Sequence, residues 1–237
     1  MVIIFLIITA MTSPLNAETR ILFLGDSLTA GYGVEQEQAF PSLLGPLITA
    51  EGYPDVKLIN AGISGSTTAS ALSRLKWYKR TRPDILFLAL GANDGLRGLS
   101  LSAMEKHLDD TIRMALDQGM TVILAGMEIP PNYGPAYTRQ FKQVFFSLAE
   151  KHSIVLMPFL LKDVAGMSQY NQADGIHPTA AGHRIIAANV LPYLVKVLKG
   201  LDTPSASVNI RSGLHIRLFW SAHAPNRRIW GTVQTFT

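Results

Sequence analysis

Short runs of apolar residues alternate along the chain with longer stretches in which apolar residues recur every three or four positions. From Arg20 onward the apolar runs are five to seven residues long. Apolar runs of this length, separated by amphipathic helices, are typical of βαβ units in which a parallel sheet is buried on both faces. The pattern predicts five strands, at residues 21–25, 56–60, 85–90, 121–125 and 154–157.

The stretches between these runs have the spacing of amphipathic helices, with an apolar residue at every third or fourth position. Four such stripes are present: Phe40, Leu43, Leu44, Leu47 and Ile48; Leu101, Met104, Leu108, Ile112 and Leu116; Phe141, Val144, Phe145 and Leu148; Ile185, Ile186, Val190, Leu194 and Val197. We expect Gly119 to end the second helix, because glycine readily adopts the left-handed conformation found just past helix ends. The last helix is expected over residues 179–198, with a bend at Pro192.

Alternating strands and helices predict an α/β domain. Right-handed crossovers between parallel strands place helices on both faces of the sheet, which gives a three-layer α/β/α sandwich. Ligands of such sheets bind at the carboxyl ends of the strands. The loops that follow the predicted strands are therefore the places to search for chemistry.

The two ends of the chain depart from this pattern. Residues 1–17 contain an apolar run from Val2 to Ile8, then Pro14 and the small residue Ala17, as in a signal peptide cleaved after Ala17. We therefore expect a periplasmic or secreted protein. The apolar run is too short to cross about 30 Å of hydrocarbon as a helix, so no stable membrane insertion is expected.

Helical spacing ends after Lys199. Residues 200–237 mix serine, threonine, proline, arginine and aromatic residues without a long alternating pattern. The chain is thus expected to consist of a signal peptide at 1–17, one globular domain at 18–199 and a C-terminal appendage of unknown role at 200–237.

Composition excludes several classes of site. The net charge is +4, but four arginines and one aspartate after residue 200 supply +3 of it, so the domain itself is nearly neutral and nucleic acid is not an expected partner. The chain has no cysteine, which excludes a thiol nucleophile, disulfides and thiolate metal sites. Nothing in the sequence indicates the oligomeric state.

A serine directly follows the first predicted strand, in the segment Gly25-Asp26-Ser27-Leu28-Thr29. This position suits a nucleophile, because the N-terminus of the following helix favours a developing negative charge. A serine there is more often a helix cap, and a glycine-rich turn can also hold a phosphate. Ser27 alone therefore does not decide the function.

A possible base for Ser27 lies in Asp174-Gly175-Ile176-His177-Pro178, between the fifth strand and the last helix. A neutral imidazole can take the serine proton, and a carboxylate can orient the imidazole and stabilise its charged form. Two intervening residues on a loop let both side chains face one pocket. Solvated or structural roles are expected for the other five histidines, because none has a carboxylate at a suggestive offset.

Two further loops can supply hydrogen-bond donors to an oxyanion. Gly65 follows the second strand and lets the backbone N–H approach a substrate, while Asn93 follows the third strand and offers a side-chain amide. Each is also an ordinary turn residue. Four loops with complementary chemistry at one sheet edge favour catalysis over turn formation.

Taken together, the four blocks resemble the GDSL or SGNH hydrolases, with Ser27, Gly65, Asn93 and His177 at the matching positions and Asp174 three residues before the histidine. The similarity extends from about residue 20 to 198. It implies a flavodoxin-like sandwich with strand order 2-1-3-4-5 and hydrolysis through an acyl-enzyme with no metal or cofactor. It also implies an oxyanion hole made of the Ser27 N–H, the Gly65 N–H and the Asn93 amide.

Residues 94–98 and 129–134 are similar to the periplasmic acyl thioesterase, lysophospholipase and arylesterase branch of that family. The resemblance implies small-molecule ester or thioester substrates and places Leu96, Ile129 and Tyr133 along an acyl groove. Glu128 is a charge beside this groove and leaves the preferred chain length open.

Two other functions stay open. A carbohydrate acetylesterase could use the same four blocks, although the apolar groove residues suit an alkyl chain better than a sugar. A non-catalytic flavodoxin-like module could bind a phosphate or nucleotide at the first loop, but it leaves Asp174 and His177 unexplained.

Overall fold

The structure is a computed structural model that describes residues 18–202. The predicted signal peptide at 1–17 and all but the first three residues of the predicted appendage at 200–237 lie outside the described residues.

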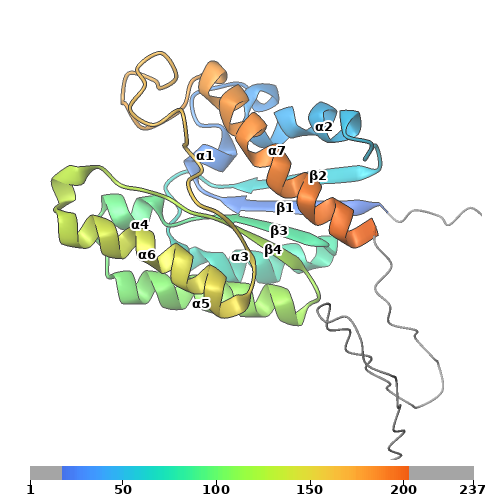
Figure 1. The fold of residues 1–237 in the computed structure, drawn as a ribbon, viewed down its shortest axis with the longest axis horizontal. Helices are drawn as coiled ribbons and strands as arrows, with labels where there is room; N and C mark the ends of the chain where they lie inside the picture. Colours follow the sequence, from blue (N-terminus) through green and yellow to red (C-terminus); the bar gives the residue numbers. More distant parts are fainter. Residues whose placement is uncertain (1–17, 203–237) are drawn as a thin grey trace, which may run out of the picture.

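A parallel sheet of five strands forms the middle layer, in the order β2-β1-β3-β4-β5 (Figure 1). The strands are β1 (Thr19–Gly25), β2 (Val56–Gly62), β3 (Ile85–Ala89), β4 (Thr121–Ala125) and β5 (Val155–Met157). The predicted three-layer fold and the flavodoxin-like strand order are confirmed, and each predicted strand overlaps an observed one.

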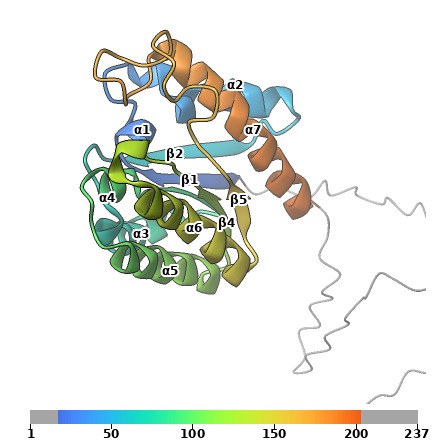
Figure 2. The same cartoon turned by 60° about the vertical axis from the view of Figure 1, so that its left-hand side comes forward.

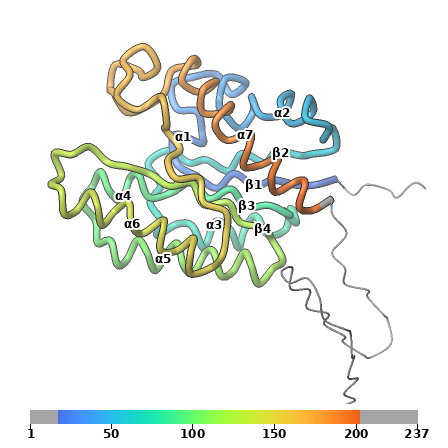
Figure 3. The backbone as a smooth tube through the Cα atoms, viewed as in Figure 1, coloured from blue at the N-terminus to red at the C-terminus, as the bar shows by residue number. Residues whose placement is uncertain are grey.

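Helices cover both faces of the sheet (Figures 1 and 3). One layer contains α2 (Phe40–Ala50) and α7 (Ala180–Asp202), and the other contains α3 (Ala71–Tyr78), α5 (Leu101–Asp117) and α6 (Pro135–His152). Shorter elements lie in the connections: α1 (Ser27–Ala30), α4 (Ala92–Leu96), and the 3-10 turns η1 (Gln36–Gln38), η2 (Thr68–Ser70), η3 (Lys79–Thr81) and η4 (Pro131–Tyr133).

The central strands are apolar at successive positions because both of their faces are covered. All five residues of β3 are buried, as are the last five of β1. Phe23 of β1 packs against Phe87 of β3 and Phe40 of α2, with ring centroids 5.3 and 5.9 Å apart. Gly25 at the end of β1 pairs with Ala89 at the end of β3, so the two strands end at one level. Helices α1 and α4 lie at this end of the sheet (Figure 2).

Helix α5 shows how the predicted apolar stripe departs from the structure. Met104, Leu108 and Ile112 are buried, but Leu116 is exposed and Ala115 takes the inward position. Each four-residue step turns a helix 40° beyond a full turn, so three steps from Met104 carry Leu116 about 120° away from the buried face. Gly119 follows this helix with a φ of 78°, as expected.

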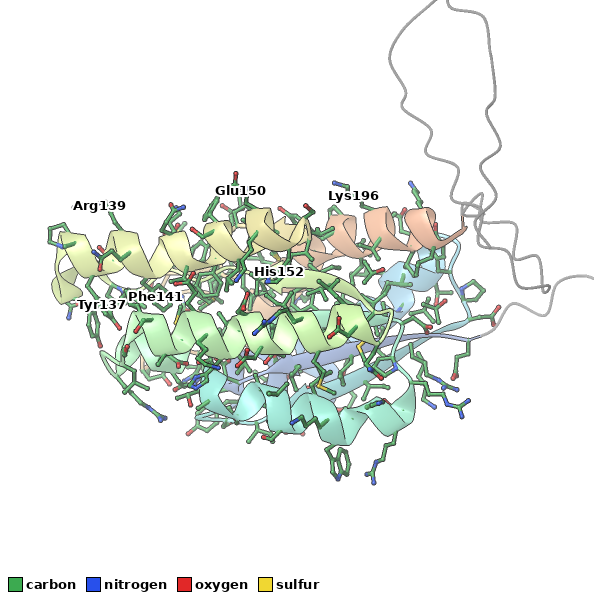
Figure 4. All side chains as sticks on the ribbon, turned by 90° about the horizontal axis from the view of Figure 1, so that it is seen from below. Tyr137, Arg139, Phe141, Glu150, His152 and Lys196 are labelled. Carbon is green, nitrogen blue, oxygen red and sulfur yellow. The ribbon has the colours of Figure 1, made fainter. Side chains whose placement is uncertain are left out.

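His152, at the end of α6, has a carboxylate partner 43 residues away in the chain, which no offset in the sequence indicated. Its Nε2 lies 2.6 Å from the Asp109 carboxylate of α5, which Lys151 and Arg113 also approach. Figure 4 shows the His152 side chain directed from α6 toward α5. Burial raises the pKa of Asp109, but the hydrogen bonds from Lys151 and His152 outweigh it and hold the pKa below its usual range. These contacts of Asp109 join α5 to α6, and no motif in the sequence indicated them.

The last helix runs four residues beyond its predicted end and contains Pro192 in its interior. Over residues 18–202, no helix combines the length and the apolar character needed to cross a bilayer.

Candidate active site

The structure brings Ser27, His177 and Asp174 together in one row. The Oγ atom of Ser27 lies 2.9 Å from Nε2 of His177, and Nδ1 of His177 lies 2.6 Å from Oδ2 of Asp174. Ser27 begins α1, with one residue between it and the end of β1, whereas Asp174 and His177 lie in the loop before α7, and His177 is 150 positions away from Ser27. In three dimensions this loop lies beside α1 (Figure 3).

The loop that carries Asp174 and His177 is shaped by the aspartate itself. Oδ1 of Asp174 accepts hydrogen bonds of 3.0 Å from the backbone N–H groups of Ile176 and His177, and Gly175 has a φ of 75°. The hydrogen bond with the His177 ring, followed by these two backbone bonds, lowers the pKa of Asp174 to about 2. The carboxylate is therefore ionised at neutral pH.

Tyr32 and Gln172 connect the histidine loop to the serine loop. The Tyr32 ring lies against the His177 ring, with centroids 4.6 Å apart. Gln172 Nε2 donates to the Tyr32 carbonyl at 2.7 Å and to the Pro178 carbonyl at 2.9 Å. These contacts hold the imidazole over Ser27 although the two segments are distant in sequence.

Asp26 supports the turn into α1 and was not assigned a role from the sequence. Its side chain is buried, and its Oδ1 accepts a 3.0 Å hydrogen bond from the Leu28 N–H, so it caps the helix that begins at Ser27. Burial raises the pKa of Asp26 to about 6. The cap that we considered for Ser27 is thus provided by its neighbour, which leaves the serine hydroxyl to face His177.

Arg74 is a second residue that sequence reasoning missed. From α3 its guanidinium donates to the Gly25 carbonyl at 2.8 Å and to the Ala61 carbonyl. Gly25 is the last residue of β1 and Ala61 the last but one of β2, so both carbonyls lie just before the segments of Ser27 and Gly65. No apolar stripe predicted helix α3, and an arginine on a helix normally lies on a solvated face, so no pattern in the sequence could have pointed to this contact.

The predicted oxyanion donors converge on one cavity. Ser27, Gly65 and Asn93 all belong to its lining. Gly65 has a φ of 78° in a turn closed by the Ser66 N–H and the Ile63 carbonyl, a conformation that favours glycine. Asn93, in the first turn of α4, donates from Nδ2 to the Ser66 carbonyl at 3.0 Å. An amide nitrogen has two hydrogens, so one remains for another acceptor.

This cavity has a volume of about 710 Å³ and a largely apolar lining. Leu96, at the end of α4, and Ile129, in the connection after β4, both line it. Tyr133 is not among the lining residues. Its hydroxyl instead donates a 2.7 Å hydrogen bond to the Leu96 carbonyl. Tyr133 therefore stabilises the end of α4, where Leu96 lies.

Further apolar residues of the cavity were not singled out from the sequence: Leu28, Met127, Pro130, Phe159 and Leu161. Met127 and Phe159 lie two positions beyond the ends of β4 and β5, so the rule that sites form at the carboxyl ends of strands could have found them. Glu128 also lines the cavity, but Lys142 lies 2.6 Å from its carboxylate and neutralises the charge.

Histidine and carboxylate groups could hold a metal ion only if several gathered at one point. No cluster of three or more such side chains is found in the part of the chain that the structure describes. The row of hydroxyl, imidazole and carboxylate can instead perform proton transfer and nucleophilic attack with side chains alone.

Comparison with known sequences identifies similar esterases. Residues 23–185 match the profile of the GDSL-like Lipase/Acylhydrolase family. The chain is 37% identical to "Esterase TesA" of Pseudomonas aeruginosa, covering 81% of this chain and 96% of that protein. It is 38% identical to "Arylesterase" of Vibrio mimicus, covering 79% and 94%, and 33% identical to "Thioesterase 1/protease 1/lysophospholipase L1" of Escherichia coli K12, covering 77% and 86%.

Solved structures show the same similarity. The crystal structure of TesA is 37% identical and superposes with a TM-score of 0.72, covering 74% of this chain and 98% of that one. The esterase EstA from Pseudoalteromonas sp., in a structure inhibited by monoethylphosphonate, is 36% identical with a TM-score of 0.72, covering 76% and 99%. AlinE4, an SGNH-hydrolase family esterase, is 35% identical with a TM-score of 0.65, covering 78% and 98%.

Proposed function

The chain belongs to the GDSL-like lipase/acylhydrolase family and is a serine esterase, a carboxylic ester hydrolase, and we propose that three of its residues perform the reaction. In this proposal Ser27 is the nucleophile, His177 is the general base and acid, and Asp174 orients His177. The observation that carries this assignment is the unbroken row of two hydrogen bonds from Asp174 through His177 to Ser27. This membership also sets aside the alternative of a non-catalytic binding module.

In the first half-reaction, Ser27 Oγ attacks the carbonyl carbon of the ester while His177 Nε2 takes the serine proton. The ionised Asp174 stabilises the imidazolium that forms and fixes its Nδ1–H toward the carboxylate. When the tetrahedral intermediate collapses, the bond to the alkoxy or thiolate leaving group breaks. His177 gives that group the proton, and the acyl chain stays esterified to Ser27.

In the second half-reaction, His177 takes a proton from a water molecule that attacks the acyl-enzyme. Collapse of the second tetrahedral intermediate returns the proton to Ser27 Oγ and releases the carboxylic acid. Both half-reactions develop negative charge on the same carbonyl oxygen. We propose that the N–H groups of Ser27 and Gly65 and the Asn93 amide stabilise this oxyanion, since all three residues line the cavity.

We propose that the cavity receives the acyl chain of an ester or thioester of small to medium length. Leu96, Ile129 and Phe159 give it apolar walls, and the one carboxylate of its lining outside the triad loop, Glu128, is paired with Lys142. A sugar ring would need several polar partners in that place. An acetylated carbohydrate is therefore the less favoured substrate, and rates on p-nitrophenyl esters from acetate to decanoate, compared with acetylated xylan, distinguish the two.

We also propose that the protein is exported, because residues 1–17 contain an apolar run followed by a small residue, as in a signal peptide. Cell fractionation and N-terminal sequencing of the mature protein test this point. A mature chain that still begins at Met1 would contradict it.

Labelling with an alkyl phosphonate tests the nucleophile. Wild-type protein should form one covalent adduct, located on Ser27 by peptide mass spectrometry, and Ser27→Ala should form none. Ser64→Ala is a matched control, because Ser64 lines the same cavity but lies outside the row of hydrogen bonds. An adduct that persists in Ser27→Ala, or that is lost in Ser64→Ala, would refute the assignment.

A further inference from the structure

A buried carboxylate joins the two loops that carry Gly65 and Asn93. Asp94 follows Asn93 directly and its side chain is buried, as is that of Thr68, three residues after Gly65. Oδ2 of Asp94 accepts the Thr68 N–H at 2.9 Å, and Oδ1 accepts the Thr68 hydroxyl at 2.6 Å. Neither residue is part of the cavity lining.

This contact differs from the two other hydrogen bonds between the same loops. The bond from Asn93 to the Ser66 carbonyl is partly buried, and the bond from Arg97 to the Gly65 carbonyl is exposed. Water can compete for exposed groups, whereas a buried, charge-assisted hydrogen bond persists. The two bonds between Asp94 and Thr68 are therefore the lasting connection between the loops.

The paired geometry fixes orientation as well as distance. Both carboxylate oxygens bind groups of one residue, a backbone N–H and a side-chain hydroxyl, so the carboxylate cannot rotate or slide relative to Thr68. Asn93 is adjacent to Asp94 on one side, and Gly65 is one short turn before Thr68 on the other. Any shift between the loops would change the separation of the Gly65 N–H and the Asn93 amide.

We propose that Asp94 and Thr68 are positioning residues for the oxyanion hole, holding its Gly65 and Asn93 donors at the separation that the tetrahedral intermediate requires. This inference rests on the proposed function. An oxyanion hole is effective because its donors are fixed before charge develops, and small displacements of such groups cost large factors in rate.

His107 of α5 extends the connection outward. Its Nδ1 lies 3.3 Å from the Thr68 hydroxyl oxygen. The hydroxyl hydrogen is used in the bond to Asp94, so the oxygen acts as acceptor and the His107 tautomer with hydrogen on Nδ1 is the one that fits. The pair is thereby tied to a long helix as well as to the two loops.

Thr68→Val is the decisive substitution, because valine keeps the side-chain shape and the backbone N–H while removing the hydroxyl. We expect kcat to fall by about 10- to 100-fold, somewhat less than for the complete loss of one oxyanion donor. KM should change by less than about threefold, because the apolar cavity binds the ground-state ester as before. Thr68→Ser, which restores the hydroxyl, should recover most of the rate.

Thr111→Val is the matched control. Thr111 is also fully buried, and its hydroxyl donates to the His107 carbonyl at 2.7 Å within α5, without a hydrogen bond to the Gly65 or Asn93 segment among those found in the described residues. The two valine variants lose the same kind of group from similar surroundings, so a general loss of stability should affect both. Only Thr68→Val should lose kcat selectively.

A ligand that imitates the oxyanion separates positioning from general structure. Alkyl trifluoromethyl ketones add to the serine and form an oxyanion, whereas the product acid does not. In Thr68→Val, affinity for the ketone should fall in proportion to kcat, and affinity for the product acid should change by less than about threefold. Asp94→Asn leaves one acceptor oxygen for the two Thr68 donors, so one of the two hydrogen bonds is lost. This variant should behave in the same way and serves if the valine variant does not fold.

Equal kcat and equal ketone affinity in Thr68→Val and Thr111→Val would overturn the inference. The proposed function would still stand in that case, provided that the phosphonate labels Ser27 in the wild type. Absence of that label would instead refute the proposed function itself.

Discussion

Asp174 holds His177 at two points, because one carboxylate oxygen accepts the His177 backbone N–H at 3.0 Å and the other lies 2.6 Å from ring atom Nδ1. A single side chain therefore fixes both the course of the loop and the direction of the imidazole. Nδ1 must carry the hydrogen in this arrangement, which leaves Nε2 free to accept the Ser27 proton. The geometry makes the tautomer of His177 depend on the charge of Asp174.

Asp174→Asn should lower kcat by about 10³- to 10⁴-fold, because an amide can donate to Nδ1 and stabilise the wrong tautomer. Stopped-flow or steady-state kinetics on a p-nitrophenyl ester would measure the loss. Asp163→Asn, an exposed aspartate in the same connection between β5 and α7, should keep the wild-type rate. A Asp174→Asn variant with more than a tenth of the wild-type kcat would contradict the assigned role.

Ile129→Ala should reduce activity on long acyl chains selectively. The substitution removes three carbons from the wall of the cavity, and each buried methylene contributes about 0.8 kcal/mol to binding. We expect kcat/KM for decanoate to fall by about tenfold or more, with acetate little changed. Leu99→Ala serves as control, since Leu99 is exposed and lies outside the cavity lining. Equal losses on acetate and decanoate would show that Ile129 does not contact the chain.

Replacing His183 with asparagine should make the free energy of unfolding less sensitive to acid. The buried His183 ring accepts the Phe40 N–H at 3.2 Å through Nδ1, and burial lowers the pKa of His183 to about 4. The unfolded chain, with an ordinary histidine pKa of about 6.5, binds the proton more readily, so folding free energy is lost as the pH falls from 6.5 to 4. The loss reaches about 3 kcal/mol.

Asparagine keeps an acceptor for the Phe40 N–H but does not titrate. At pH 7 the variant should be less stable than the wild type, because the smaller side chain leaves space in the core. This difference should shrink by about 3 kcal/mol between pH 7 and pH 4 in denaturant unfolding. A difference that stays constant over that range would disprove the explanation.

Asp26→Asn should stabilise the protein at neutral pH. Burial raises the pKa of Asp26 to about 6 from an ordinary 3.8, so the folded state binds the proton more readily and stability is lost as the pH rises from about 4 to 6. Asparagine keeps the cap to the Leu28 N–H without the charge. Above pH 6 the variant should gain up to about 3 kcal/mol, and the gain should vanish below pH 4.

Asp26→Ala separates the cap from the charge. It removes both, so it should be about 1 kcal/mol less stable than Asp26→Asn at every pH. Thermal unfolding of the three proteins at pH 4, 6 and 8 provides the comparison. An Asp26→Asn gain that does not depend on pH would show that the carboxyl does not titrate in this range.

The sheet was predictable because its central strands are buried on both faces. Their apolar runs, in β1 and β3 above all, leave little choice of element, and turn residues mark their ends. Serine, glycine, asparagine and histidine could be assigned to one edge because parallel strands end together. The predicted apolar stripe was wrong at Leu116, which is exposed. Repeated steps of four residues drift around the helix, which has 3.6 residues per turn, and so leave the buried face.

Contacts between segments distant in the sequence could not be predicted. Thr68 and Asp94 lie 26 residues apart in ordinary turn sequences, and Arg74 reaches its two carbonyls from a helix. Tyr133 lies in the expected loop, but only three-dimensional packing decides whether its hydroxyl faces the cavity or the Leu96 carbonyl. Chemical type and spacing identify such residues as candidates, and packing assigns their roles.

The 150-residue distance between Ser27 and His177 also has a consequence for biosynthesis. The serine is translated early, but its partner histidine emerges only after all five strands, and α7 follows it. With His177 as the proposed base, a nascent or prematurely terminated chain would present the Ser27 hydroxyl without its base and should not hydrolyse esters. Under the proposed roles, hydrolytic activity requires that the loop with His177 has been synthesised and has come to lie beside Ser27, so the appearance of activity would report that these two segments have met.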